Sequence, residues 1–149
     1  MRIIVQRSLN SSVSIDSNIV GKIDSGMVIL VGFTHDDNES DIDYLIHKLL
    51  HLRIFEDEKG QMNKSILDTK GNILSISQFT LYGDTKKGNR PSFVDAMAFD
   101  KAKDLYEMFN KKLSEHIHVE AGVFGADMKV SITNDGPVTI LLESGHKHD

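Results

Sequence analysis

Short apolar runs joined by connections of only a few residues fill the first third of the chain. Their length and β-branched content predict strands over residues 2–7, 12–15, 19–23 and 27–31. Asn10–Ser11 and Ser25–Gly26 separate these runs as turns, and the unbroken apolar run at 27–31 indicates a buried central strand. Connections of this length cannot hold a parallel crossover, so neighbouring strands are expected to pair mainly antiparallel.

Two later segments have helical spacing instead. The first opens with an acidic block at residues 36–43, which suits the partial positive charge at a helix N-terminus, and continues with Ile42, Leu45, Ile46 and Leu49. The second has Phe99, Ala102, Leu105, Tyr106, Phe109 and Leu113 along one face. Further strands are predicted over residues 52–55, 72–79, 128–132 and 138–142, the last two joined by a tight turn at Asn134–Gly136. This is the pattern of one α+β domain over residues 1–149, mainly antiparallel, with residues 145–149 as a polar tail.

The chain has no cysteine, which excludes disulfides, a thiolate nucleophile and Cys-based zinc sites. It also lacks the run of roughly 18 apolar residues that a membrane helix needs, and a signal-peptide layout. We therefore expect a cytoplasmic protein with no membrane partner. The net charge of −5 argues against a general nucleic-acid binder that works by bulk electrostatics, and we expect no DNA partner, although a few well-placed cations can still hold a nucleic acid.

Polar residues end the strand predicted at 72–79 and form a first candidate site. Ser77, Gln78 and Thr80 supply hydroxyl and amide groups, and the end of the ladder frees backbone N–H groups around Phe79. Donors of this kind can hold the oxyanion that develops in acyl transfer. On composition alone, a plain strand end followed by a turn is the simpler interpretation, because Ser and Thr commonly terminate elements.

A Gly-Pro pair, Gly136–Pro137, forms a second candidate site. Proline is tolerated where a strand begins, and a Gly-Pro peptide bond can be cis. The glycine leaves the main chain bare, so a ligand can touch a backbone oxygen directly. Without further information, an ordinary hairpin turn explains this segment better.

A basic loop with Lys86, Lys87 and Arg90 next to glycine is suited to gripping phosphate. It lacks the spacing of a Walker sequence, and most short basic clusters are simply solvated surface.

Histidines give no clear metal site. His47 and His51 are four residues apart, as two ligands on a helix face are, but Lys48 breaks the HExxH pattern and no third ligand is obvious. We therefore expect neither a metal nor a cofactor.

Several segments together resemble the D-aminoacyl-tRNA deacylase family over nearly the whole chain. The matching segments are residues 1–7, 52–58, 62–63, 77–80, 87–93, 122–128 and 134–139. A lone Gly-Pro pair or a lone Ser-Gln-Phe-Thr sequence is a weak signal. Both in this order, with the other segments between them, are specific.

The resemblance implies barrel-like β-sheets with two main helices packed against them, and a homodimer whose active sites lie at the subunit interface. In that arrangement the Gly136–Pro137 bond is cis and enters the partner's pocket, where the two main-chain oxygens hold the amino group of the esterified amino acid. Arg7 holds this motif in place, and Met128 lies near the terminal adenine. The catalytic pocket is lined on its other side by Ser77, Gln78, Phe79 and Thr80, with the N–H groups of Phe79 and Thr80 near the ester.

The implied activity is hydrolysis of the ester of D-aminoacyl-tRNA, and of glycyl-tRNA mischarged on tRNA-Ala, as a chiral proofreading step. A pocket of main-chain atoms pressed against Cα rejects an L side chain by clash, but it cannot exclude glycine. No side-chain nucleophile or tuned general base is visible, which agrees with assistance from the 2′-hydroxyl of the tRNA. The partner is the acceptor end of aminoacyl-tRNA, with Lys86, Lys87 and Arg90 as candidate phosphate contacts.

Two alternatives stay open. The first is a non-catalytic protein that binds a D-amino acid or a nucleotide in the same pocket, and the intact motifs at 77–80 and 136–137 weigh against it. The second is a hydrolase of free esters or small amides, and the basic loop favours tRNA instead.

Overall fold

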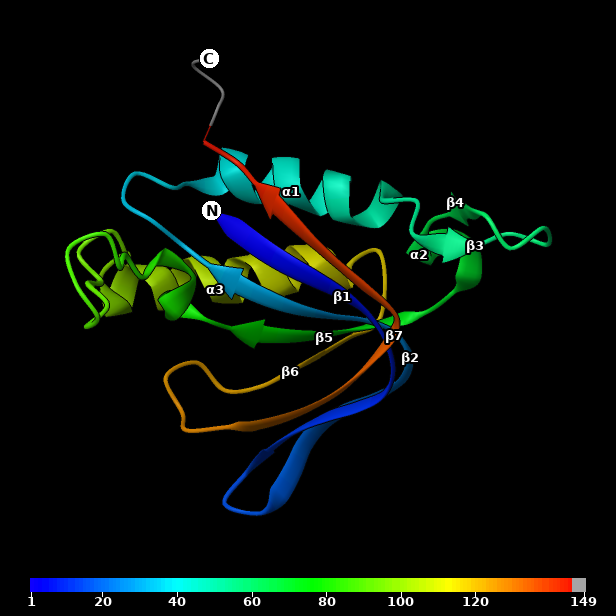
Figure 1. Ribbon diagram of the computed structural model, residues 1–149, viewed down its shortest axis with the longest axis horizontal. Helices are drawn as coiled ribbons and strands as arrows, with labels where there is room; N and C mark the ends of the chain where they lie inside the picture. The colour runs from blue at the N-terminus through cyan, green and yellow to red at the C-terminus, as the bar shows by residue number, and fades with distance from the viewer. Residues whose placement is uncertain (146–149) are drawn as a thin grey trace.

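The computed structural model describes residues 1–145, and Figure 1 shows a strongly bent sheet with two long helices beside it. The strands are β1 (Arg2–Ile15), β2 (Asn18–Gly32), β3 (Phe55–Glu56), β4 (Met62–Lys64), β5 (Asn72–Ser77), β6 (Val119–Ala121) and β7 (Lys129–Glu143). The helices are α1 (Glu39–His51), α2 (Ile66–Thr69) and α3 (Phe99–Ser114), and Phe79–Tyr82 forms a 3-10 turn, η1. No helix among these is long and apolar enough to cross a membrane.

The main sheet has the strand order β6-β5-β2-β1-β7. β1 pairs antiparallel with β2 and β7 over long ladders, whereas β5 pairs parallel with β2 and β6 over shorter ones. The parallel pairs arise because α1 and α2 lie between β2 and β5, and α3 lies between β5 and β6, so each connection crosses over the sheet. The α+β prediction is confirmed. Barrel-like closure is not, since no ladder joins the edge strands β6 and β7 within the described residues.

Three predicted turns are wrong, because each is an irregularity inside a long strand. β1 continues through Asn10, where its register with β7 shifts between Leu9 and Ser12. β2 continues through Gly26, whose φ of +140° and contact with the Asn72 backbone suit only glycine. The hairpin predicted at 134–136 is absent, since both halves of β7 pair with β1 rather than with each other. Bulge and turn use the same residue types, so sequence does not separate them.

Two other strand predictions are correct only in part. The strand predicted over residues 52–55 is reduced to Phe55–Glu56, which pairs with β4 in a small separate hairpin. The strand predicted over residues 72–79 ends at Ser77, because the chain turns into η1. The helix α2 is only four residues long and has no apolar spacing that predicts it.

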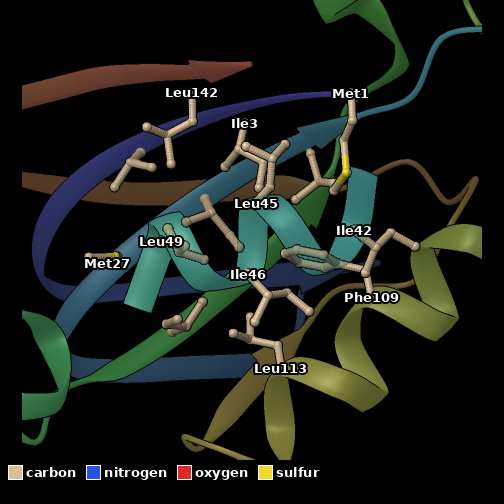
Figure 2. Packing of buried hydrophobic residues seen from close by; sticks show 14 of the residues in the cluster. Met1, Ile3, Met27, Ile42, Leu45, Ile46, Leu49, Phe109, Leu113 and Leu142 are labelled. Atoms are coloured by element: carbon tan, nitrogen blue, oxygen red, sulfur yellow. The ribbon is translucent and has the colours of Figure 1, made fainter. Parts of the chain in front are cut away.

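Both predicted helices are present and pack on one face of the sheet. Figure 2 shows Leu45 and Leu49 of α1 and Phe109 of α3 turned toward Ile3 and Met27 of the strands, and all five are fully buried. The strand residues alternate, so Val28 of β2 and Leu74 of β5 point to the opposite face, where they form a second buried cluster with Val13 and Ile23. Partly buried Met128, Val130 and Ile132 cover this second cluster. The sheet therefore has apolar packing on both faces at the end of β5.

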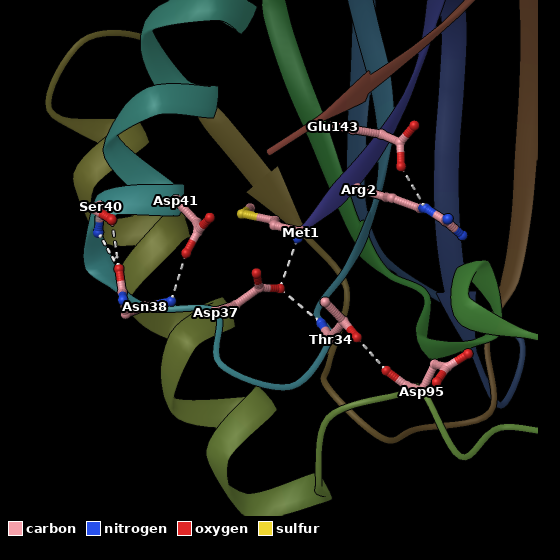
Figure 3. Close-up of polar contacts among 9 residues, drawn as sticks. All are labelled: Met1, Arg2, Thr34, Asp37, Asn38, Ser40, Asp41, Asp95 and Glu143. Atoms are coloured by element: carbon pink, nitrogen blue, oxygen red, sulfur yellow. Dashed lines mark hydrogen bonds and ion pairs between the residues drawn. The ribbon is translucent and has the colours of Figure 1, made fainter. Parts of the chain in front are cut away.

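The start of α1 is fixed by a capping box (Figure 3). The Asn38 side chain accepts from the Ser40 N–H at 2.9 Å, and the Asp41 carboxylate accepts from the Asn38 N–H at 2.9 Å. These bonds satisfy N–H groups that have no partner inside the helix. The acidic residues thus begin the helix as the sequence predicted.

Candidate functional site

A cavity of about 560 Å³ opens beside the end of β5. Its lining comes from residues 76–79, from Phe93 and the segment leading into α3, and from the segment between β6 and β7 that includes Phe124 and Met128. Most of the lining is apolar, and its polar side chains are those of Ser77 and Gln78. None of the lining residues identified in the described chain carries a carboxyl, imidazole, amino or guanidinium group.

The polar edge of the cavity is made by the end of β5 and the turn that follows it. Ser77 is the last residue of β5 and pairs with Val31 of β2. The Gln78 N–H donates to the Val31 carbonyl at 2.7 Å, and the Leu81 N–H donates to the Gln78 carbonyl at 3.2 Å. The ladder thus ends abruptly and the chain turns away from the sheet at Phe79.

Two backbone donors are left free by this turn. The N–H groups of Phe79 and Thr80 precede the first hydrogen bond of η1, and neither has a protein acceptor within residues 1–145. The Gln78 side-chain amide donates to the Thr80 hydroxyl. Phe79 is 57% exposed, and Thr80 is exposed but outside the lining. The predicted segment therefore presents unpaired donors beside an apolar cavity.

Aromatic rings that the sequence analysis did not select form much of the wall. Phe93 meets Phe79 edge-on at 5.1 Å between ring centroids, and Phe124 meets Phe99 at 5.0 Å. Phe93 and Phe124 lie in segments that resemble the family, and that resemblance was the only signal in the sequence that could have selected them. Met128 reaches the wall because Gly122 has no side chain. A Cβ added at Gly122 would lie only 2.5 Å from the Met128 sulfur, which is too close.

A buried polar cluster supports this wall from below. The Tyr106 hydroxyl on α3 donates to the Ser75 carbonyl of β5 at 2.8 Å, and the Ser75 hydroxyl donates to the Asn110 side chain at 2.7 Å. Burial raises the pKa of Tyr106, so the hydroxyl stays protonated and acts as a donor. The Tyr106 ring also contacts Phe124 at 5.8 Å. α3 is thus tied to β5 directly beneath the cavity.

Gly136 and Pro137 lie in a bulge of β7, and the peptide bond between them is cis. The register passes from Gln6↔Thr139 to Ser8↔Asn134, so residues 135–138 face Arg7 alone on β1. Gly136 has a φ of +129°, and both motif residues are exposed. The bulge therefore projects bare main chain outward from the sheet.

Arg7 is buried, with 6% of its surface exposed, and it holds this bulge. Its Nε donates to the Asp135 carbonyl at 3.1 Å, and its Nη1 donates to the Ile54 carbonyl at 2.8 Å. The Glu56 carboxylate lies 3.7 Å from its Nη2. One guanidinium thus joins β1, the bulge and the β3–β4 hairpin.

The structure groups the predicted site residues into two sets. Ser77, Gln78, Phe79 and Met128 line the cavity, and Thr80, the next residue after Phe79, is exposed and is not part of the lining. Arg7 belongs with Gly136 and Pro137, and none of these three lines the cavity within the chain. Within one chain, the predicted site residues therefore form two separate groups.

The basic loop is exposed and lies next to the cavity along the chain. Lys86, Lys87 and Arg90 form no ion pair with any residue in the described range. Paired backbone hydrogen bonds of 2.8 Å between Asp84 and Ser92 close the loop just before Phe93, which lines the cavity. The three cations are thus available to an anionic partner.

The histidines contribute no metal centre in the part of the chain that the structure describes, where no three His, Asp or Glu side chains are arranged to hold an ion. His47 and His51 are exposed on α1 with ring centroids 4.3 Å apart. The histidines of the polar tail, His146 and His148, lie outside the described residues.

Comparison with known sequences gives a consistent match. A family described as D-Tyr-tRNA(Tyr) deacylase matches residues 4–143. The D-aminoacyl-tRNA deacylase of Bacillus pumilus is 59% identical over 145 residues, which cover 97% of this chain and 99% of that protein. The D-aminoacyl-tRNA deacylase of Thermus aquaticus is 54% identical over 148 residues, which cover 99% of this chain and 97% of that protein. The matched residues 4–143 include both groups of predicted site residues.

Two solved structures share the fold. The c-Myc DNA unwinding element binding protein has a TM-score of 0.93 and 39% identity, covering 97% of this chain and 99% of that chain. A probable eukaryotic D-amino acid tRNA deacylase has a TM-score of 0.82 and 18% identity, covering 95% of this chain and 97% of that chain. At that identity the second likeness shows the fold alone.

The contacts of Arg7 predict a large loss of stability when its guanidinium is removed. Arg7→Met is expected to lower the free energy of unfolding by about 2–4 kcal/mol, because charged donors to two carbonyls are lost. Arg53→Met is the matched control, since exposed Arg53 also makes two hydrogen bonds, both to Asn63, and its loss should cost about 1 kcal/mol or less. Urea unfolding measures both, and equal losses contradict the assignment.

Proposed function

The chain belongs to the D-Tyr-tRNA(Tyr) deacylase family and is a hydrolase of D-aminoacyl-tRNA, and we propose that it proofreads chirality in a pocket shared between two subunits. The observation that carries the proposal is the separation of two half-sites on one chain. The cavity has free backbone donors, and the exposed Gly136–Pro137 bulge lies outside it. In a homodimer, each bulge completes the cavity of the partner.

The cavity half binds the reacting end of tRNA. The N–H groups of Phe79 and Thr80 have no protein acceptor in the described chain, and they receive the ester oxygen as negative charge develops on it. Ser77 and Gln78 complete the polar edge, and Met128 contacts the terminal adenine across the apolar wall. These residues act through hydrogen bonding and shape.

The Gly136–Pro137 bulge selects D-amino acids over L-amino acids. The main-chain oxygens of Gly136 and Pro137 hold the amino group of the esterified amino acid, and Arg7 fixes their position from below. When the amino group and the ester are both held, the Cα of the esterified amino acid lies against the main chain of the bulge. An L side chain would project into that main chain, so L-aminoacyl-tRNA is rejected by a steric clash. Glycine has no side chain to reject, and glycyl-tRNA mischarged on tRNA-Ala is cleaved as well.

The chemistry relies on the substrate. No cavity-lining residue in the described chain has a group able to serve as a general base near neutral pH. The Thr80 hydroxyl already accepts a hydrogen bond from Gln78, which favours a donor role for it over attack on the ester. We assign activation of the water to the 2′-hydroxyl of the terminal ribose.

The remaining tRNA contacts come from the basic loop. Lys86, Lys87 and Arg90 are exposed and unpaired in the described chain, and they contact phosphates of the acceptor end. Residues 1–149 act as one deacylase domain in the cytoplasm, where charged tRNA is used. A non-catalytic binder of D-amino acids or nucleotides is the second candidate, and the hydrolysis assay separates the two.

The proposal predicts stereospecific hydrolysis. With matched D-tyrosyl-, L-tyrosyl- and glycyl-tRNA, the protein should release D-tyrosine and glycine. It should release L-tyrosine at least about 100-fold more slowly than D-tyrosine. Release of labelled amino acid measures this. Equal rates for the two tyrosyl esters contradict the chirality argument, and binding without hydrolysis favours the non-catalytic candidate.

Thr80→Ala tests the role of the only exposed hydroxyl on η1 near the ester. We expect a rate within about threefold of the wild type, because the backbone N–H is kept and no covalent step is lost. Loss of a true nucleophile costs roughly 10⁴-fold or more. Single-turnover kinetics measure the rate, and a loss of that size in a folded variant restores Thr80 as the nucleophile.

Heterodimers test whether the site is shared. Phe79→Pro removes a free N–H at a position where a turn tolerates proline, and a Cβ at Gly136 lies 2.8 Å from Val138 and 3.1 Å from the Arg7 guanidinium. Phe79→Pro and Gly136→Ala homodimers should both be inactive. A dimer with one change on each chain regains one intact shared site, and about half the activity.

The reciprocal heterodimer is the matched control. When one chain carries both changes and the other is wild type, each shared site contains one defect and activity should be lost. Sites confined to one chain predict the opposite result for both heterodimers. A purely monomeric protein in sedimentation at assay concentration also contradicts the proposal.

A further inference from the structure

The turn that presents the free N–H groups has little stability of its own. η1 spans only Phe79–Tyr82, and a 3-10 turn of this length fixes several dihedral angles for very few hydrogen bonds. The direction of the Phe79 and Thr80 N–H groups therefore depends on contacts from outside the turn.

Strand β2 supports the beginning of the turn. The Val31 carbonyl accepts from the Gln78 N–H, and Gly32 lets the turn lie close to the sheet. A Cβ at Gly32 lies 2.9 Å from the Gln78 carbonyl and 3.2 Å from the Leu81 Cβ. Gln78, the residue that precedes the turn, is thus held against β2 by a backbone hydrogen bond and close backbone packing.

Arg2 of β1 supports the opposite end of the turn. Its Nη1 donates to the Leu81 carbonyl at 2.8 Å, and its guanidinium carbon lies 4.5 Å from the centre of the Tyr82 ring. A cation is favourable at the carbonyl end of a helical turn, and it is also attracted to the face of an aromatic ring. Arg2 therefore contacts both of the last two residues of η1.

The guanidinium of Arg2 is oriented by a third partner. Arg2 pairs with Glu143 across the β1–β7 ladder, and its Nε lies 2.9 Å from the Glu143 carboxylate (Figure 3). With Nε on Glu143 and Nη1 on Leu81, two donors of the planar guanidinium fix its orientation. Arg2 does not line the cavity. Any effect of Arg2 on the cavity is therefore transmitted through η1.

We propose that Arg2 is a positioning residue for deacylation, holding η1 so that the Phe79 and Thr80 N–H groups face the ester. The inference rests on the proposed function. Removing Arg2 leaves the cavity and the tRNA contacts intact, but it frees the carbonyl end of the turn. We therefore expect a lower rate of the chemical step and an unchanged affinity for the substrate, because a small misplacement of preorganised donors lowers the rate by a large factor.

The test compares Arg2→Met, Arg2→Lys and Glu143→Gln with the control Lys22→Met, an exposed cation of β2. In single-turnover hydrolysis of D-tyrosyl-tRNA, Arg2→Met should be roughly 10- to 100-fold slower. Its Kd for the tRNA should stay within about twofold of the wild type. Arg2→Lys keeps a charged donor for Leu81 and should recover most of the rate. Glu143→Gln and Lys22→Met should be close to wild type.

Hydrogen exchange supplies a readout other than activity. In Arg2→Met, the amides of Leu81 and Gly83, which donate to the Gln78 and Thr80 carbonyls, should exchange faster than in the wild type, whereas those of β5 should not change. A wild-type rate in Arg2→Met, or an equal loss in Glu143→Gln, overturns the assignment. If Arg2→Met does not fold, Arg2→Gln takes its place with the same expectations, and a wild-type rate there also overturns it. A wild-type protein that leaves D-tyrosyl-tRNA intact contradicts the proposed function instead.

Discussion

The buried guanidinium of Arg7 supplies hydrogen bonds where backbone pairing between β1 and β7 is interrupted, and the shape of the bulge in β7 depends on these bonds. The pairing of β1 with β7 is interrupted opposite Arg7, where four residues of β7 face one of β1. An interruption of that size leaves backbone carbonyls without their usual donors, which is costly when they are shielded from water. Arg7 supplies charged donors to Asp135 and to Ile54. The bulge can therefore hold a defined shape while its outer side stays bare.

The helices were predictable from sequence because local chemistry determines them. The acidic first turn and the apolar spacing indicate the same start and face for α1, and the structure adds the Asn38 cap. Strand continuity was not predictable. Asn10, Gly26 and the Asn134–Gly136 segment are residues that serve equally in turns and bulges, and only the pairing partner decides between them. The partner of residue 134 lies more than a hundred positions away on β1, beyond the reach of any local pattern.

The candidate site was predictable mainly through the resemblance. The apolar pattern predicted a strand over residues 72–79, but it gave no reason for Met128 to lie beside the end of that strand. Phe93 and Phe124 were not selected, since an aromatic residue in a loop carries no spacing signal. The structure adds a chemical reason for the composition of the cavity. With no ionisable side chain among its described lining residues, the cavity offers a ligand its shape, the polar groups of Ser77 and Gln78, and backbone dipoles.

The pairing of the first strand with the last has a consequence for the nascent chain. Arg2 lies opposite Glu143, so one side of β1 has no neighbour until β7 has left the ribosome. During synthesis the β1–β2 hairpin exposes a long unpaired edge, the kind of surface on which chains associate wrongly. Contacts this distant in sequence also form slowly, because a large loop must close first. Completion of the fold is therefore a late event, and the deacylase remains exposed to aggregation until β7 docks.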